Sequence, residues 1–427
     1  MILPINLAGV LPVNSDVIVI GAGIVGLSSA YYLTCAGLTV TVIDEGQPAS
    51  ARCSSGNAGM IVPSHFVPLA APGMVEYGLR MLSDKQSPFG VKIRADHRLV
   101  DWGLKFMRSC TPAHVDSCVH ILRDLNLRSR ELYIALDDDL EGGFDLTLRG
   151  LTMFCKTNES LHHEYAFADK AVALGVPATK LDKAQVQALD PSLELDVAGG
   201  VYFPKDAHLS PDKLLHRLQT YLVSKGVTFH WNARAESIKP ASSSVDVSVG
   251  TSRMSAGKVV IAGGTWSPHL TETLGVRMPM QGGKGYSFIL DNPIQLPEIC
   301  SILVEARVAV TPMGGRLRIG GTMEIAGDDL SVNQNRVSGI RKSVQEYFPA
   351  YRDKLDNLTP VWSGLRPCSP DGLPYIGELK SDNVVVATGH SMMGLSLGPV
   401  TGEVVTDIVT GSKPKFDIQQ LRPERWG

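Results

Sequence analysis

The sequence contains no C-x-x-C pair, no run of basic residues and no stretch of 18 apolar residues. The seven cysteines are odd in number and scattered, at positions 35, 53, 110, 118, 155, 300 and 368. This pattern indicates neither a disulfide framework nor a metal site of the zinc type, and it fits a reducing compartment. A formal net charge of −3 without a basic stripe gives no reason to expect nucleic acid as a partner.

The first 14 residues are apolar, but they contain no Lys or Arg and are interrupted by Pro4 and Pro12. They lack the charged start of a signal peptide and are too short to span a bilayer. We expect a tail on the surface of a cytoplasmic protein. Because no longer apolar run exists, any contact with the inner face of the membrane would be peripheral.

The residues that are present favour a nucleotide-binding unit between positions 15 and 44. A β-branched run at 17–20 is typical of a buried parallel strand, and Gly21, Gly23 and Gly26 follow it in the G-x-G-x-x-G spacing. The first glycine allows a tight turn, the second lets backbone approach a pyrophosphate, and the third lets helix and strand pack closely. A helix is expected at 24–36, and its first N–H groups, beginning at Ile24 and Val25, suit an anion.

Asp44 directly follows the next predicted strand, at 38–43, and lies 18 residues after Gly26. An acid at this distance can accept hydrogen bonds from an adenosine ribose. A glycine triplet alone is weak evidence, but the whole strand–turn–helix–strand–acid unit predicts a dinucleotide site. The alternative, a glycine-rich turn without a ligand, leaves Asp44 unexplained.

Residues 45–60 are rich in glycine and other small residues, which let backbone amides approach a ligand closely. Because this stretch directly follows the second strand, we expect it beside the cofactor. The candidates to touch a pyrophosphate or the cofactor's ring system are Ser54, Ser55, Gly56, Asn57 and Ala58. The alternative is a flexible surface loop.

The rest of the chain mixes helical and strand-like patterns. Charges on one face predict helices at 99–107 and 114–136, and alternation around Gly150 predicts a strand pair over 144–156. Prolines at 63, 68, 72 and 88 predict that residues 61–90 form no regular structure. Gly314 and Gly315 lie between two alternating runs and predict a hairpin.

The apolar strand Lys258–Trp266 ends in a glycine pair and indicates that the chain returns to the nucleotide-binding unit. We therefore expect two interleaved domains. The cofactor domain is expected at 14–92, 200–275 and 360–427, and the substrate domain at 93–199 and 276–359. The fold class is α/β: a Rossmann-like domain interleaved with an α+β domain that is built on a mixed or antiparallel sheet.

These segments together resemble the D-amino acid oxidase-like flavin-dependent amine oxidoreductases, which include glycine and sarcosine oxidases. The resemblance spans residues 16–409 and is carried by GAGIVG with Asp44, SSGNAG, VVIAGGTW, GLRPCSPDGLPYIG and GHSMMGLSLGP. The run NAGMIVPSHFVPLAAPG is most similar to the small subunit of bacterial D-amino acid dehydrogenases and to D-hydroxyproline dehydrogenases. The resemblance implies FAD in a Rossmann-like domain of the glutathione reductase type.

Carried over by position, the resemblance implies contacts with each part of FAD. The ADP half would be held by Gly21, Gly23, Ile24, Val25, Gly26, Asp44 and Glu45. The flavin would be lined by Ser54, Ser55, Asn57, Ala58, Gly59 and Met60. Gly263 and Trp266 would close over the cofactor, and the start of the last helix would meet the flavin through Gly389, Met393, Gly394 and Leu395. A helix N-terminus at the pyrimidine edge would stabilise the reduced flavin's negative charge.

Three residues are candidates for the substrate side. Arg366 matches the position that approaches the substrate in this family, and a guanidinium pairs bidentately with an amino acid carboxylate. Its alternative role is to stabilise the surrounding glycine-rich loop. Tyr286 could add a hydrogen bond to the carboxylate, or it could be an ordinary strand aromatic with its hydroxyl at the surface. His65 could reach the active site, although a lone histidine is more often structural.

One position departs from part of the family. Some relatives hold flavin through a cysteine shortly before the SPD segment, and here Gly364 stands at that place, with Cys368 four residues later. We therefore expect FAD to be bound non-covalently and Cys368 to be a small packing residue.

The resemblance implies oxidation of the C–N bond of an amino acid, most specifically a D-amino acid and with proline-type substrates included. With the carboxylate held, the α-hydrogen would leave as hydride to flavin N5, and the imino acid would hydrolyse to a 2-oxo acid. Electrons would pass to a quinone or another carrier. The alternatives are an oxygen-using oxidase of glycine, sarcosine or D-amino acids, and a non-catalytic flavin- or nucleotide-binding subunit. The sequence selects neither the stereoisomer, the acceptor nor the oligomeric state.

Overall fold

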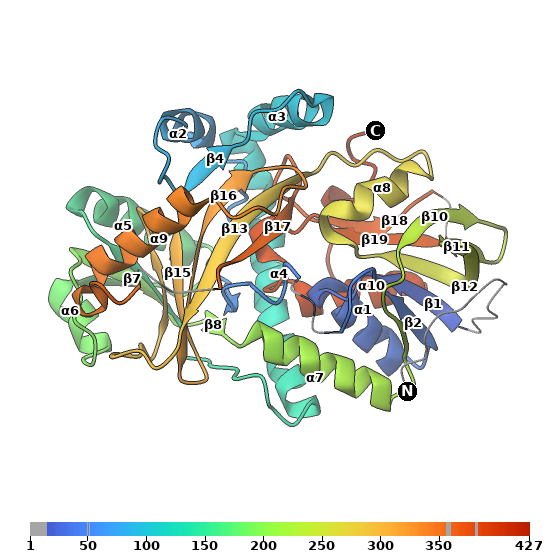
Figure 1. Cartoon of the computed structure of the whole chain (residues 1–427), viewed down its shortest axis with the longest axis horizontal. Helices are drawn as coiled ribbons and strands as arrows, with labels where there is room; N and C mark the ends of the chain where they lie inside the picture. Colours follow the sequence, from blue (N-terminus) through green and yellow to red (C-terminus); the bar gives the residue numbers. More distant parts are fainter. Residues whose placement is uncertain (1–14, 49, 51, 356–359, 381–382) are drawn as a thin grey trace. The chain divides into compact units, whose positions relative to one another are not determined.

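The computed structural model describes residues 15–427 except 49, 51, 356–359 and 381–382, so the expected N-terminal tail lies outside the described residues. The chain divides into two units that interleave along the sequence (Figure 1). The first comprises 1–50, 215–280 and 367–427, and the second 51–214 and 281–366.

These boundaries differ from the expected ones at four places: residues 51–92, 200–214 and 360–366 belong to the second unit, and residues 276–280 belong to the first. In the second unit, β3 (Met60–Ile61) pairs with β8 (Ala207–His208), and β4 (Phe89–Val91) pairs with β16 (Arg316–Ile325). Pairing between strands far apart in the sequence therefore sets the division of the chain.

In the first unit, eight strands of the described residues form one sheet. Its centre is parallel, in the order β19 (Val384–Thr388), β12 (Ser252–Ile261), β1 (Ser15–Ile20), β2 (Val40–Ile43) and β9 (Thr228–His230). Antiparallel strands extend it: β10 (Ala235–Pro240), β11 (Val245–Val249) and β18 (Tyr375–Glu378). The buried β-branched residues of the central strands explain the parallel arrangement, since such strands are covered on both faces.

Two helices of the first unit pack closely. α1 (Ile24–Cys35) meets α10 (Gly398–Val409) at Gly402, where a Cβ would lie 2.5 Å from the carbonyl oxygen of Ser28. The absence of a side chain at Gly402 permits the close approach of α10 to α1.

The shorter elements of the first unit are η1 (Gly264–Trp266), α8 (Ser267–Glu272), η3 (Ser391–Met393) and η4 (Gln419–Leu421).

The second unit is built on a sheet of nine strands among the described residues. Eight follow the order β17 (Trp362–Cys368), β13 (Gln281–Leu290), β16, β15 (Val308–Met313), β14 (Cys300–Leu303), β5 (Leu151–Cys155), β7 (Gly199–Phe203) and β6 (Thr179–Asp182). β13, β16, β15 and β14 pair antiparallel in that order, as do β5, β7 and β6, whereas β14 with β5 and β16 with β4 are parallel. The expected mixed α/β fold is confirmed.

The second unit also contains helices, several of which begin at capping side chains. They are α2 (Met74–Met81), α3 (His97–Ser109), α4 (Pro112–Asp139), α5 (Asn158–Ala173), α6 (Lys183–Leu189), α9 (Gln334–Tyr347) and η2 (Pro349–Tyr351). α7 (Pro211–Ser224) begins in the second unit and continues into the first. The side chains of Asp96 and Thr111 accept hydrogen bonds at the starts of α3 and α4, and Asp182 with Gln185 forms a capping box at α6. No helix within the described residues has the length and apolar character to cross a membrane.

Two local predictions were wrong and one is confirmed. Residues 144–150 do not form a strand, since only β5 follows Gly150, whose φ of +79° serves a turn. Residues 61–90 contain helix α2 despite their prolines, because all four prolines lie outside its eight residues. The hairpin at Gly314 and Gly315 joins β15 to β16, and both glycines have positive φ.

Candidate functional site

The glycine turn after β1 is constrained by its neighbours. Gly21 has a φ of +109°, and a Cβ there would lie 2.5 Å from the carbonyl oxygen of Ala262. A Cβ on Gly26 would lie 1.8 Å from the carbonyl oxygen of Gly21, so α1 can begin this close to β1 only with glycine at both positions. The helix starts at Ile24 after Gly23, with no side-chain cap and no acid in its first turn. Its N-terminal dipole therefore suits an anion.

Asp44 is held at the carboxyl ends of the parallel strands. Its Oδ2 accepts a hydrogen bond from the backbone N–H of Ala22 at 2.7 Å, and its Oδ1 accepts one from Gly46 at 2.8 Å. Open α/β sheets bind ligands at these strand ends. The carboxylate is thus fixed at the strand ends, the part of such a sheet where ligands bind.

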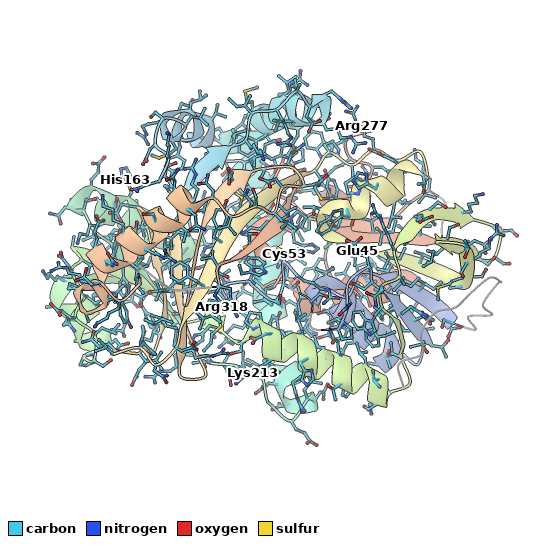
Figure 2. The ribbon with its side chains drawn as sticks, in the orientation of Figure 1. Glu45, Cys53, His163, Lys213, Arg277 and Arg318 are labelled. Atoms are coloured by element: carbon cyan, nitrogen blue, oxygen red, sulfur yellow. The ribbon has the colours of Figure 1, made fainter. Side chains whose placement is uncertain are left out.

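A cavity of about 390 Å³ lies at the same edge of the first unit. Five of the predicted cofactor residues line it: Gly21, Asp44, Glu45, Gly263 and Trp266. Of these five, Glu45 is labelled in Figure 2. Three further lining residues, Arg234, Glu236 and His269, were not predicted from the sequence. Carboxylates, a glycine backbone and apolar walls together fit the adenosine half of a dinucleotide.

The predicted residues at 389–395 are described but are not among those that line this cavity. Gly389 has a φ of +78°, and a Cβ there would lie 2.6 Å from the ring of Tyr375. Gly394 is different, because its nearest neighbour to a Cβ would be His390 Cβ at 3.7 Å, an ordinary contact. Met393 ends η3 and Leu395 is buried. The protein itself therefore explains the glycine at 389 but not the one at 394.

The loop at 54–60 belongs to the second unit and is anchored to its sheet. Arg318 on β16, labelled in Figure 2, donates from Nη1 to the carbonyl oxygens of Ser55 at 2.6 Å and Asn57 at 2.8 Å. Ser287 on β13 donates from Oγ to the carbonyl oxygen of Gly56 at 2.9 Å. The carbonyl groups of three successive residues, 55 to 57, are therefore fixed by hydrogen bonds. The alternative of a flexible surface loop does not agree with this anchoring. Arg318 is buried, and this burial lowers the pKa of its guanidinium.

The end of the same loop turns sharply into β3. Asn57 Oδ1 accepts a hydrogen bond from the backbone N–H of Gly59 at 2.8 Å. Gly59 has a φ of +78°, and a Cβ there would lie 2.2 Å from the carbonyl oxygen of Leu209. Met60 then enters β3. The predicted loop residues are therefore brought together with defined geometry, Ala58 among them.

Trp362 on β17 packs against this loop. A Cβ on Gly56 would lie 2.1 Å from the indole, and a Cβ on Gly364 would also lie 2.1 Å from it. The indole thus fills the space of both missing side chains, which gives position 364 a structural reason to be glycine. The buried indole Nε1 finds no hydrogen-bond partner among the described residues. Cys368 is fully buried, as its packing role predicts.

Arg366, also on β17, is held in a defined position by its neighbours. Its Nη1 donates to the carbonyl oxygen of Thr322 at 2.7 Å, and a Cβ on Gly285 would lie 2.3 Å from its Nη2. Thr322 has a φ of +70° at an irregularity between β13 and β16, an uncommon conformation for a β-branched residue. The backbone is therefore strained at Thr322, the residue whose carbonyl oxygen orients the guanidinium. The missing side chain of Gly285 leaves room for the guanidinium of Arg366.

Tyr286 is placed in a different setting. It is 1% exposed and packs in the core that includes α9, and its hydroxyl donates to Glu324 Oε2 at 2.7 Å. Burial and the neighbouring Glu324 raise the pKa of Tyr286. Lys284 lies beside it and donates to Asp329 at 2.8 Å. Because the phenol has one proton to donate, a bond to a substrate carboxylate would require release of Glu324.

His65 ends a short hydrogen-bonded chain. The backbone N–H of Ser64 donates to Asp206 Oδ1 at 3.0 Å, its Oγ donates to Oδ2 at 2.5 Å, and the same Oγ lies 3.0 Å from His65 Nδ1. Burial lowers the pKa of His65 to about 4, with a further contribution from Arg307, and raises the pKa of Asp206 to about 7. When Asp206 is ionised, the hydroxyl of Ser64 donates its proton to Asp206. The Ser64 oxygen can then only accept from His65, so Nδ1 of His65 must carry the proton in this bond.

Comparisons with known proteins agree across the chain. The family described as "FAD dependent oxidoreductase" matches residues 16–408. The D-amino acid dehydrogenase of Xanthobacter autotrophicus is 30% identical over 417 residues, covering 96% of this chain and 99% of that protein. The D-amino acid dehydrogenase of Methylobacterium radiotolerans is 32% identical over 418 residues, covering 96% and 99%. The crystal structure of glycine oxidase from Geobacillus kaustophilus has a TM-score of 0.78 at 24% identity, covering 96% and 98%, a likeness of fold.

Proposed function

This chain belongs to the family of FAD-dependent oxidoreductases, and from that premise we propose that it oxidises the C–N bond of a D-amino acid. FAD is its cofactor. Identity of 30–32% to D-amino acid dehydrogenases over 96% of the chain supports the amino acid substrate. Transfer of electrons to a quinone or another carrier, proline-type substrates and a cytoplasmic location with peripheral membrane contact are finer parts of this proposal.

The observation that carries the proposal is that neighbouring residues hold the guanidinium of Arg366 in a defined position. Its guanidinium is oriented by the Thr322 carbonyl oxygen and lies over Gly285, where any side chain would exclude it. A planar guanidinium recognises a carboxylate through two parallel hydrogen bonds. An amino acid held in this way has its carboxylate plane fixed, which restricts where its α-carbon can lie, and positioning of this kind supplies a large share of catalysis.

The cofactor contacts form the second part of the proposal. Gly21, Gly23, Gly26 and Asp44 would hold the ADP half, with Glu45, Gly263 and Trp266 in the same cavity lining. The anchored residues 54–60 and the segment 389–395 would approach the flavin. Binding would be non-covalent, since Gly364 stands at the position where some relatives have a cysteine.

The residues of the chain suggest a simple division of work. FAD, when bound, supplies the acceptor for the hydride of the substrate's α-carbon. Arg366 holds the carboxylate and so orients that carbon. The substrate ammonium must lose a proton first, so that the nitrogen lone pair can assist departure of the hydride. No side-chain base is required for this, although His65 is a candidate to accept that proton. The imino acid is then released and hydrolyses to a 2-oxo acid.

The test is anaerobic bleaching of the bound flavin by panels of D- and L-amino acids, with glycine, sarcosine and both hands of proline and hydroxyproline. We expect bleaching by D-forms. Loss of a charge-assisted pair is worth about 1.5–3 kcal/mol, so Arg366→Met should raise the substrate concentration that gives half the maximal bleaching rate roughly tenfold to a hundredfold. The matched control is Arg253→Met, which removes an exposed arginine paired with Asp246 in the first unit.

The possible outcomes separate the alternatives. Bleaching by glycine or sarcosine alone, with rapid return of colour in air, would identify an oxygen-using oxidase. Slow recovery in air after bleaching by D-amino acids would support a dehydrogenase with another acceptor. If FAD is present and no amino acid bleaches it, the assignment is wrong and a non-catalytic flavin-binding subunit becomes the better account.

A further inference from the structure

Exposed apolar side chains gather on one segment of the second unit. Of the thirteen large apolar side chains that are exposed in the described part of the chain, six lie between positions 79 and 107. They are Leu79, Leu82, Ile93, Val100, Leu104 and Met107, with exposed fractions as high as 85% for Ile93. The others are scattered singly between positions 148 and 392. Single exposed apolar residues are ordinary, but a cluster indicates an interaction surface.

Three of the six side chains share one face of α3, and the other three lie on the segment that precedes it. Val100, Leu104 and Met107 recur at the spacing of one helix face, whereas Trp102 on the opposite side is buried and stacks on Phe106. Helix α2 carries Leu79, and β4 leads from it to the loop that carries Ile93. Figure 1 shows α2, β4 and α3 along one edge of the second unit. We call this set of six side chains the apolar edge.

The apolar edge has basic neighbours. Residues 74–110 contain seven Lys or Arg and four Asp or Glu, a balance of +3 in a chain whose net charge is −3. Asp96 pairs with Arg94, Asp101 pairs with Lys105, and Asp329 from outside the segment pairs with Lys92. The exposed basic side chains of the segment are Arg80, Lys85, Lys92, Arg98 and Arg108, and its exposed acids are Glu76 and Asp84. An apolar helix face with a cationic border is the pattern of helices that lie in a membrane interface.

The charge balance also selects the partner. A second copy of this chain, placed face to face by a two-fold axis, would bring two patches of the same sign together. An anionic lipid surface meets them with opposite charge, and each Lys or Arg near such a surface contributes attraction.

We propose that the apolar edge rests on an anionic phospholipid bilayer, with its apolar side chains among the acyl-chain ends and its basic side chains at the lipid phosphates. This deepens the proposed delivery of electrons to a carrier and rests on that part of the proposed function. The contact itself requires no catalysis, so its test is independent of the oxidation chemistry.

The test is co-sedimentation of the FAD-loaded protein with two kinds of vesicle, phosphatidylcholine alone and phosphatidylcholine mixed with phosphatidylglycerol. We expect binding to the mixed vesicles, with weaker binding as salt is raised. Leu104→Glu should reduce the partition coefficient tenfold or more, since it replaces an apolar side chain that the bilayer would bury with a charged one. The matched control is Val172→Glu on α5, also an exposed helix position of the second unit at 55% exposure, which should bind as the unaltered protein does.

Each result decides the matter. Failure to bind mixed vesicles, binding that ignores lipid charge, or equal losses in the two glutamate variants would overturn the lipid contact. A change of oligomeric state in Leu104→Glu without vesicle binding would assign the edge to protein contacts instead. Flavin bleaching by D-amino acids, measured on the same preparations, reports on the proposed reaction and should stay unchanged in both variants.

Discussion

Gly394→Ala separates the needs of the protein from those of its cofactor. Gly394 has φ −56° and ψ −39°, which any residue adopts, and a Cβ there would meet only His390 Cβ at 3.7 Å. Replacing such a glycine by alanine reduces the entropy of the unfolded chain and stabilises by about 0.4–1 kcal/mol. The apoprotein should therefore melt at the same temperature or slightly higher.

The same methyl group should weaken FAD binding if Gly394 faces the flavin. Overpacking by one methyl costs about 1–3 kcal/mol, which is about 5-fold to 150-fold in the FAD dissociation constant. The assay is titration of apoprotein with FAD by flavin fluorescence, with melting curves in both states. The control is Gly103→Ala on α3, where a Cβ would meet nothing within 4 Å and FAD affinity should not change. Equal dissociation constants for Gly394→Ala and the control would refute the proposed role of Gly394.

Three further predictions concern the frame of the site. Gly26→Ala places a Cβ 1.8 Å from the Gly21 carbonyl oxygen, so we expect a loss of FAD and a lower melting temperature even without ligand. Arg318→Met removes two charge-assisted hydrogen bonds to the loop at 54–60 and should lower FAD content, whereas unchanged FAD content would show that the loop holds without them. Burial raises the pKa of Asp206 to about 7, whereas the ordinary value is near 4. Between these two pH values the carboxyl group is protonated in the folded protein and ionised in the unfolded chain. The contribution of Asp206 to stability therefore falls as pH rises through about 7. The melting temperature of Asp206→Asn minus that of the unaltered protein should thus be larger at about pH 8 than at about pH 5; a constant difference would contradict the buried charge.

Local sequence patterns determined the nucleotide half of the protein. The glycine spacing, the β-branched run and Asp44 all lie within 30 consecutive residues, and the interactions that join them are short in sequence: Asp44 binds the N–H of Ala22, and Gly26 meets Gly21. The hairpin at Gly314 and Gly315 was predictable for the same reason. A turn and its two strands carry their own signal.

Only the tertiary structure decided which groups surround the predicted site residues of the second unit. Arg318 reaches a loop more than 260 residues earlier, and the indole of Trp362 fills the space at Gly56, pairings that no local pattern announces. Tyr286 was a candidate for the substrate on its residue type, yet burial and Glu324 engage its hydroxyl. The apolar edge likewise needed burial to be known, since periodicity reports an amphipathic helix but not which face a neighbour covers. Local chemistry follows from neighbours along the chain, whereas long-range packing settles which polar groups are already paired and which surfaces stay exposed.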